Sequence, residues 1–328
     1  MKIFQNPASV PDDVQGGVLA LGNFDGVHRG HQAVIGEALR LGRATGRPVG
    51  VMTFDPHPRQ FFQPNATMFT LTPTPQKLKF FNALGLDFAG VMTFNADMAS
   101  LTGDAFIRDI LHGIWHAGHV VVGYNFFFGK GRSGSPQLLA EIGREVGFDV
   151  SVMSPASDDG EVFSSSAVRD YLRAGDVRGA ADVLGYWWTV AGVVESGAGI
   201  GTGMGYPTAN VMLEPGQDLH HGIFAARVLV DGRRFDAAAY LGRRPTFDNG
   251  IAKLEVYLFE FDDDLYGREI NVELIDFIRP DQGFESAEAL VAQMDDDCAK
   301  AREILARIKA NDPMTKFLIG RATSALYD

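Results

Sequence analysis

The sequence predicts an α/β fold, in which a parallel sheet covered by helices on both faces is followed by a small antiparallel β-barrel with a terminal helix. Up to Gly185, short apolar runs alternate with helical patterns, as is typical of a parallel sheet. After Gly185 apolar and polar residues alternate, which indicates antiparallel strands. Because 328 residues exceed what one core usually serves, we expect two domains, residues 1–185 and 186–328.

The charge and the cysteine content exclude several classes of protein. The chain has 29 Lys and Arg against 41 Asp and Glu, a net charge of −12, so a broad surface for nucleic acid or an anionic membrane is not expected. The single cysteine, Cys298, excludes an intramolecular disulfide. No apolar run is long enough to span a bilayer, and the first residues lack the apolar region of a signal peptide. We therefore expect a cytoplasmic protein.

In the first domain, the expected strands are short and apolar: residues 17–24, 48–54, 88–94, 119–126 and 148–155. The expected helices lie between and after them, at residues 31–42, 74–85, 104–118 and 138–147, with two short helices within 168–185. Functional residues of such a sheet belong at the carboxyl ends of its strands. The segments GNFDGVH, FDPHP and GYNF all fall at these ends.

In the second domain, alternating segments predict the strands of the barrel at residues 188–197, 224–241, 254–261 and 270–278. Asp231-Gly232 predicts a tight hairpin turn within the second of these segments. Residues 286–308 predict an amphipathic helix that Ser286 N-caps.

Two histidines, His28 and His31, share one face of the first helical turn after the first expected strand, where backbone N–H groups favour an anion. Gly22, Gly26 and Gly30 would let a bulky ligand approach the backbone. Two imidazoles there suit a phosphate chain, because they can donate hydrogen bonds to oxygens whose charge grows during phosphoryl transfer. The alternatives are a pair that caps or packs, and a zinc site, for which no third His or Cys has a supporting spacing.

The chain resembles the prokaryotic bifunctional riboflavin kinase/FMN adenylyltransferase family, also called FAD synthetases, from about residue 15 to about residue 308. The resemblance rests on these segments in the family's order: FDGVHRGH, FDPHP, GYNFFFGKGRSG, SSSAVRDYLRAGDV, GYPTAN, LGRRPTF and LEVYLFEFDDDLYG. GNFDGVHRGH is also similar to the HxGH signature of the nucleotidyltransferases. The resemblance implies a Rossmann-like nucleotidyltransferase domain and a riboflavin kinase barrel. It also implies two Mg²⁺-dependent transfers from ATP, which convert riboflavin to FMN and FMN to FAD.

For the adenylyl transfer, the resemblance implies that His28 and His31 contact the phosphates of ATP. The residues that would shape this pocket are Gly22, Asn23, Phe24 and Asp25. Asn125 would lie beside the flavin or the reacting phosphates.

The segment SSSAVR matches a second phosphate-binding signature, with Ser166 where Thr is usual and Val168 where Ile is usual. The resemblance implies that the triphosphate and the leaving pyrophosphate are held by Ser164, Ser165, Ser166 and Arg169. Without the resemblance, N-capping of the helix that follows explains the serines equally well.

For the kinase, the resemblance implies that Thr208 and Asn210 bring Mg²⁺ and the nucleotide phosphates together, with Gly205 and Pro207 in the same ATP-binding segment. Glu255 matches the family's general base, which would accept the proton of the riboflavin 5′-hydroxyl. As a single residue on a strand, Glu255 would more often face solvent.

Two other functions stay open. One is a single-activity FMN adenylyltransferase with an inactive barrel, against which the intact Thr208, Asn210 and Glu255 argue. The other is a non-enzymatic regulator that binds flavin or nucleic acid, which the acidic charge disfavours. The sequence is silent on the oligomeric state, on whether FMN is channelled between the two sites and on the role of residues 312–328. Thr202 stands where the family usually has Arg, and of Asp55 and His57 in FDPHP we favour a bracing role for His57.

Overall fold

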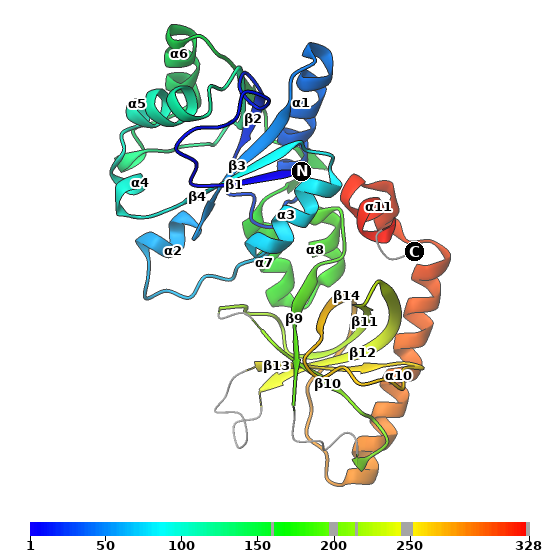
Figure 1. Cartoon of the computed structure of the whole chain (residues 1–328). Coiled ribbons are helices and arrows are strands. Elements are labelled where there is room, and N and C mark those ends of the chain that lie inside the picture. Colours follow the sequence, from blue (N-terminus) through cyan, green and yellow to red (C-terminus); the bar gives the residue numbers. More distant parts are fainter. Residues whose placement is uncertain (159–160, 197–202, 214–215, 244–251, 326–328) are drawn as a thin grey trace. The chain divides into compact units, whose positions relative to one another are not determined.

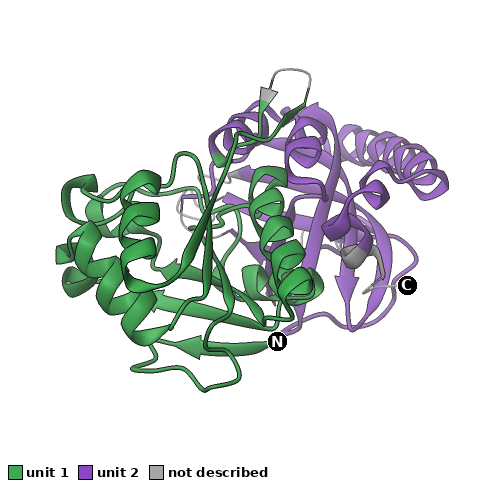
Figure 2. Ribbon diagram, turned by 90° about the horizontal axis from the view of Figure 1, so that it is seen from above, with its two compact units in different colours: residues 1–165 green, residues 166–328 purple. Residues whose placement is uncertain are grey.

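The computed structural model describes residues 1–158, 161–196, 203–213, 216–243 and 252–325 (Figure 1). The chain divides into two compact units, residues 1–165 and 166–328 (Figure 2). The sequence assigned helices α7 (Ser165–Ala174) and α8 (Val177–Leu184) to the first domain. In the structure α8 packs on a strand of the second unit. A functional boundary after residue 185 stays a prediction.

The first unit contains a six-stranded sheet in the order β1-β4-β3-β2-β5-β6. Its strands are β1 (Lys2–Gln5), β2 (Val18–Leu21), β3 (Val49–Asp55), β4 (Phe88–Thr93), β5 (His119–Gly123) and β6 (Asp149–Met153). Every neighbouring pair is parallel, which confirms the predicted sheet. The order of connection reverses between β2 and β5, and ligands of open α/β sheets bind at such a switch point.

The connections of the first unit are mostly helical: α1 (Arg29–Thr45), α2 (Pro58–Phe62), α3 (Thr74–Ala83), α4 (Ala96–Ser100), α5 (Gly103–Ala105), the π-helix η1 (Phe106–Ile114), the 3₁₀-helix η2 (Lys130–Arg132) and α6 (Pro136–Val146). Strands β7 (Ser157–Asp158) and β8 (Glu161–Val162) form a separate small ladder. Helix α1 packs on β2, β3 and β5. Its first turn therefore lies at the carboxyl end of β2.

The second unit contains a closed barrel in the order β10-β13-β12-β11-β14-β9. Its strands are β9 (Thr189–Glu195), β10 (Ala209–Met212), β11 (Gly222–Val230), β12 (Arg233–Arg243), β13 (Ala252–Leu258) and β14 (Glu269–Pro280). All neighbouring pairs are antiparallel, which confirms the predicted barrel.

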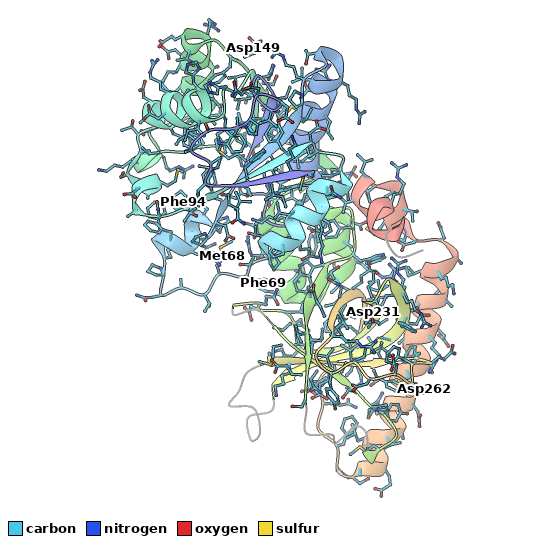
Figure 3. The ribbon with its side chains drawn as sticks, in the orientation of Figure 1. Met68, Phe69, Phe94, Asp149, Asp231 and Asp262 are labelled. Carbon is cyan, nitrogen blue, oxygen red and sulfur yellow. The ribbon has the colours of Figure 1, made fainter. Side chains whose placement is uncertain are left out.

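Two local predictions in the second unit are confirmed. Asp231 and Gly232 join β11 to β12 with φ of 49° and 74°, the left-handed conformations that a two-residue type I′ turn requires (Figure 3). Helix α10 (Ala287–Ala310) begins after Ser286, whose hydroxyl accepts a hydrogen bond from the Ala289 N–H at 3.2 Å. Among the described residues, no helix combines the length and the apolar character needed to cross a bilayer.

Residues after α10 form η3 (Pro313–Lys316) and α11 (Leu318–Ala325) and attach to the barrel through the half-buried carboxylate of Asp312. Asp312 accepts a hydrogen bond from the Trp187 indole N–H at 3.0 Å and pairs with Arg227 at 3.0 Å. Arg227 also pairs with Glu273 at 3.0 Å. Burial raises the pKa of Glu273, and the two neighbouring arginines, Arg227 and Arg234, oppose that rise. Asp312 therefore joins this segment to the charged cluster of the barrel.

Candidate active sites

The segment GNFDGVH connects β2 to α1 and ends in a histidine cap. His28 is the N-cap of α1, and its Nδ1 accepts a hydrogen bond from the His31 N–H at 3.3 Å. The rings of His28 and His31 stack, with centroids 3.7 Å apart and planes 22° apart. The capping alternative therefore describes His28 in this structure. An Nδ1 that accepts leaves the proton of the neutral ring on Nε2.

His31 is held in its neutral form. Burial, His28, Lys77 and His57 lower the pKa of His31 well below its ordinary value. Its Nδ1 is buried and has no hydrogen-bond partner within the described ranges. A neutral imidazole with an unused ring nitrogen suits a site in which a ligand completes the hydrogen bonding.

Residues predicted to shape the pocket also hold the turn between β2 and α1 in place. Asp25 is buried, and its Oδ1 accepts hydrogen bonds from the N–H groups of Leu71 and Thr72 at 3.0 and 3.1 Å. The Phe24 ring is buried and meets the His31 ring edge-on at 5.3 Å. A Cβ at Gly22 would lie 3.1 Å from the Phe24 ring. Asp25 and Phe24 thus fix the place of the histidines.

The backbone of Asn23 is fixed by two buried donors. Its carbonyl oxygen accepts hydrogen bonds from Thr53 Oγ1 at 3.1 Å and from Lys77 Nζ at 3.2 Å. Thr53 lies on β3 and Lys77 on α3, and both are buried. Sequence analysis missed both residues. The sequence does hold a signal for Lys77. It lies three and four positions before Phe80 and Phe81, and this spacing places it on the same buried face of the helix.

The serine segment reaches the same turn. Ser165 Oγ donates a hydrogen bond to the Asp25 carbonyl at 2.8 Å. A Cβ at Gly30 would lie 3.1 Å from the Phe163 carbonyl, so the segment approaches the first turn of α1 closely. On α7, Ser166 is exposed and Arg169 is buried, and both residues belong to the second unit. The phosphate-binding roles of Ser164, Ser165, Ser166 and Arg169 stay predictions.

The strands that flank β2 end in the other predicted segments. Asp55 is the last residue of β3 and His57 follows that strand, while Asn125 follows β5 and is exposed. His57 N-caps α2, accepting from the Arg59 N–H at 3.1 Å, and the Gln60 side chain completes a capping box. His57 therefore braces the loop. The contact of Asn125 with flavin or phosphate stays a prediction.

In the barrel, strand register brings the predicted kinase residues together. Asn210 on β10 lies directly opposite Glu255 on β13. Their side chains share one face because directly opposed residues of antiparallel strands do so. The adjacent Val211 and Leu254 are buried, whereas Asn210 and Glu255 are only half-buried. Glu195 on β9 lies opposite Asn210 on its other side.

The segment GYPTAN is anchored by its tyrosine. The Tyr206 hydroxyl donates a hydrogen bond to Asp295 of α10, and its ring meets Tyr257 edge-on at 5.1 Å. Burial and the Asp295 carboxylate raise the pKa of Tyr206. Gly205, with φ of 85°, and Pro207 are exposed on either side of this anchor. Thr202 and residues 244–247 lie outside the described residues.

The half-buried Thr208 precedes β10, and its carbonyl oxygen accepts a hydrogen bond from Asn210 Nδ2 at 3.4 Å. Thr208 and Asn210 offer hydroxyl, carbonyl and amide oxygens. These are the hard donors that Mg²⁺ prefers when substrate phosphates and water supply its other ligands. The residues therefore fit Mg²⁺.

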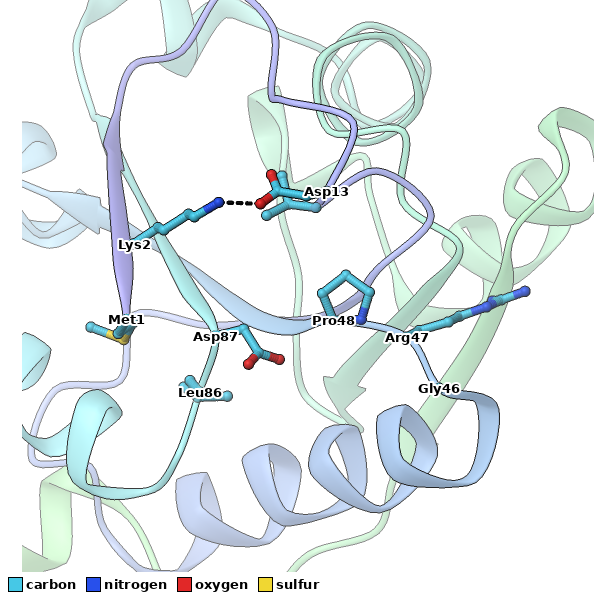
Figure 4. Close-up of a pocket in the computed structure, with 9 residues that line it drawn as sticks. Met1, Lys2, Asp13, Gly46, Arg47, Pro48, Leu86 and Asp87 are labelled. Carbon is cyan, nitrogen blue, oxygen red and sulfur yellow. Dashed lines mark hydrogen bonds and ion pairs between the residues drawn. The ribbon is translucent and has the colours of Figure 1, made fainter.

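A hollow of about 660 Å³ lies at the opposite edge of the first unit's sheet, where strands begin (Figure 4). Its polar groups are engaged within the fold. Lys2 pairs with Asp13, the Asp87 carboxylate accepts from the Val49 N–H at 2.8 Å, and Arg47 donates to the Gly118 carbonyl at 3.2 Å. Since it faces away from the carboxyl ends of the strands, it is not our candidate site.

Comparison with known proteins found two family models that match this chain. A family model described as FAD synthetase matches residues 10–167, and one described as riboflavin kinase matches residues 184–305. The bifunctional riboflavin kinase/FMN adenylyltransferase of Escherichia coli K12 is 37% identical over 296 residues, which cover 90% of this chain and 95% of that protein. The enzyme of the same description from Pseudomonas fluorescens is 34% identical over 307 residues, covering 93% and 98%.

A solved structure shares the fold. The crystal structure described as a macrolide-efflux protein from Streptococcus pneumoniae is 27% identical, with a TM-score of 0.82, and covers 92% of this chain and 99% of that chain. The family of this chain follows from its sequence identity to these enzymes and from its matches to both family models. The chain belongs to the bifunctional riboflavin kinase/FMN adenylyltransferase family.

Proposed function

We propose that this chain phosphorylates riboflavin to FMN at the barrel site and adenylylates FMN to FAD at the histidine site, with ATP as the donor in both reactions. The observation that supports this best is that each unit builds its own cluster. The stacked His28–His31 pair lies in the first unit, and the Asn210–Glu255 pair lies in the second. We assign residues 1–185 to the adenylyltransferase and 186–328 to the kinase. The partners are small molecules, and a cytoplasmic setting fits them.

In the adenylyl transfer, a phosphate oxygen of FMN attacks the α-phosphorus of ATP, and the bond to the β-phosphate oxygen breaks to release pyrophosphate. His28 and His31 donate hydrogen bonds to oxygens whose negative charge grows in the transition state. Arg169 and the hydroxyls of the serine segment hold the leaving pyrophosphate. Asn125 would lie beside the flavin or the reacting phosphates. These groups position and stabilise, so no covalent intermediate is required.

In the kinase reaction, the riboflavin 5′-hydroxyl oxygen attacks the γ-phosphorus of ATP, and ADP leaves. Glu255 accepts the proton that the hydroxyl loses. Thr208 and Asn210 would hold Mg²⁺, which when bound neutralises charge on the ATP phosphates. Gly205 and Pro207 shape the segment that meets the nucleotide. Tyr206 keeps this segment in place through its bond to Asp295.

Magnesium titration tests the assignment of Asn210. EDTA should abolish FMN formation by the parent enzyme, and Mg²⁺ should restore it. In Asn210→Ala, the Mg²⁺ concentration for half-maximal FMN formation should rise by roughly 10–100-fold, because one oxygen ligand is lost. The Mg²⁺ dependence of FAD formation from FMN serves as the internal control and should not change. An unchanged Mg²⁺ requirement for FMN formation would show that Asn210 does not hold the metal.

A further inference from the structure

Lys77 is a buried cation whose placement the fold alone does not explain. It lies on α3 with 4% of its surface exposed, and its Nζ donates one hydrogen bond, to the Asn23 carbonyl at 3.2 Å. Among the described residues, no carboxylate forms an ion pair with Nζ. Asp25 and Asp55 attract this charge, but burial dominates and lowers the pKa of Lys77. A buried ammonium without an ion pair is costly and points to a functional use.

The carbonyl that Lys77 contacts belongs to the turn before the histidines. Thr53 Oγ1 donates to the same oxygen at 3.1 Å, so donors from β3 and α3 hold it from two elements. The next residues include two non-glycine residues in the left-handed region, Phe24 with φ of 49° and Val27 with φ of 37°. Such a backbone persists only where its surroundings hold it. The two donors supply part of that hold.

We infer that Lys77 is a positioning residue for adenylyl transfer, which fixes the Asn23 carbonyl and thereby the turn that places His28 and His31. This inference rests on the proposed function of the histidine pair. A displacement of about 1 Å in groups that contact a transition state can cost on the order of 10²-fold in rate. Lys77 need not touch ATP for its loss to lower kcat.

Three variants test the inference by FAD formation from FMN. Lys77→Met keeps the aliphatic stem but removes the ammonium, and we expect kcat to fall at least about 10-fold with the KM for ATP within threefold. Thr53→Val removes the other donor without changing shape or charge, and kcat should fall at least threefold. Lys79→Met, an exposed lysine on the same helix, should stay within twofold of the parent. FMN formation should stay within twofold in all three.

A spectroscopic readout separates positioning at this turn from general stability. The groups that depress the pKa of His31 include His28, His57 and Lys77. Removing the Lys77 charge makes protonation of His31 easier, so the pKa of His31, followed by NMR of its ring carbons, should rise in Lys77→Met. It should stay unchanged in Thr53→Val. Amide exchange of β2, β3 and β5 reports whether the sheet of the first unit is intact.

The outcomes decide separately on Lys77 and on the site. If Lys77→Met keeps kcat within threefold, or if the pKa of His31 does not move, the inference is wrong. If the sheet of Lys77→Met loses amide protection, the kcat of Thr53→Val is the test in its place. An unchanged kcat in Thr53→Val then overturns the inference. His31→Ala runs beside them. If His31→Ala still makes FAD, the proposed function of the histidines fails. If His31→Ala makes no FAD while Lys77→Met stays active, only the inference about Lys77 is rejected.

Discussion

Replacing His28 or His31 by alanine is expected to lower the rate of FAD formation from FMN by about 10²–10³-fold, the usual cost of one donor to a developing charge. Riboflavin phosphorylation should continue nearly unchanged, because both imidazoles belong to the first unit. Initial rates with FMN or riboflavin as the substrate measure the two reactions separately.

The cap made by His28 calls for a matched variant. Alanine removes the acceptor for the His31 N–H as well as the ring, and loss of an N-cap costs about 1 kcal/mol. His28→Asn keeps a good N-cap but not the imidazole, so it should fold as the parent does and still lose FAD formation. His119→Ala, at the opposite edge of the sheet, is the control and should remain active. An active His28→Asn enzyme would show that His28 acts as a cap alone.

Glu255→Gln should lower the rate of FMN formation by roughly 10²–10⁴-fold, because glutamine keeps the shape and hydrogen bonding but cannot accept the proton. Riboflavin binding should hardly change. FAD formation from supplied FMN should be unaffected, since the attacking phosphate is already ionised at neutral pH and needs no base. Phosphoryl transfer has a loose transition state in which deprotonation can lag, and the lower end of the range allows for this.

A second carboxylate gives the control for Glu255. Glu195 lies on the other side of Asn210 in the same register and is exposed. Glu195→Gln should leave kinase turnover within about twofold. If Glu255→Gln stays within about threefold of the parent, below roughly 1 kcal/mol in barrier, Glu255 only positions the hydroxyl. A larger loss of kinase turnover in Glu195→Gln than in Glu255→Gln would show that the base lies on β9 and not on β13.

Features set by local sequence could be predicted. The continuous apolar runs of β2 and β3 predict parallel strands, because both faces of such strands are covered. The Asp231-Gly232 turn and the Ser286 cap depend on the conformational preferences of a few adjacent residues, and both are present. His28 and His31 were found because two imidazoles at a strand-to-helix junction form a local pattern.

Features set by tertiary contacts could not be predicted. Strand β1 (Lys2–Gln5) pairs with β4 at the sheet edge, and Phe4 is its one residue that is partly buried against the core. Strand β10 (Ala209–Met212) is too short to show alternation. The pairing of Asn210 with Glu255 is a matter of strand register, and the family resemblance implied only a kinase role for each residue. The contact between Lys77 and Asn23 joins a helix to a distant turn, which no local pattern encodes.

Mixing two single-site variants tests the central claim, that the two transfers occur at separate sites, most directly. The products formed from riboflavin, ATP and Mg²⁺ are separated by chromatography for His31→Ala, for Glu255→Gln and for their mixture. His31→Ala should accumulate FMN, Glu255→Gln should form little of either product, and the mixture should form FAD, because FMN released by one variant is the substrate of the other. A mixture that forms no FAD, although Glu255→Gln converts supplied FMN, would contradict the two-site assignment.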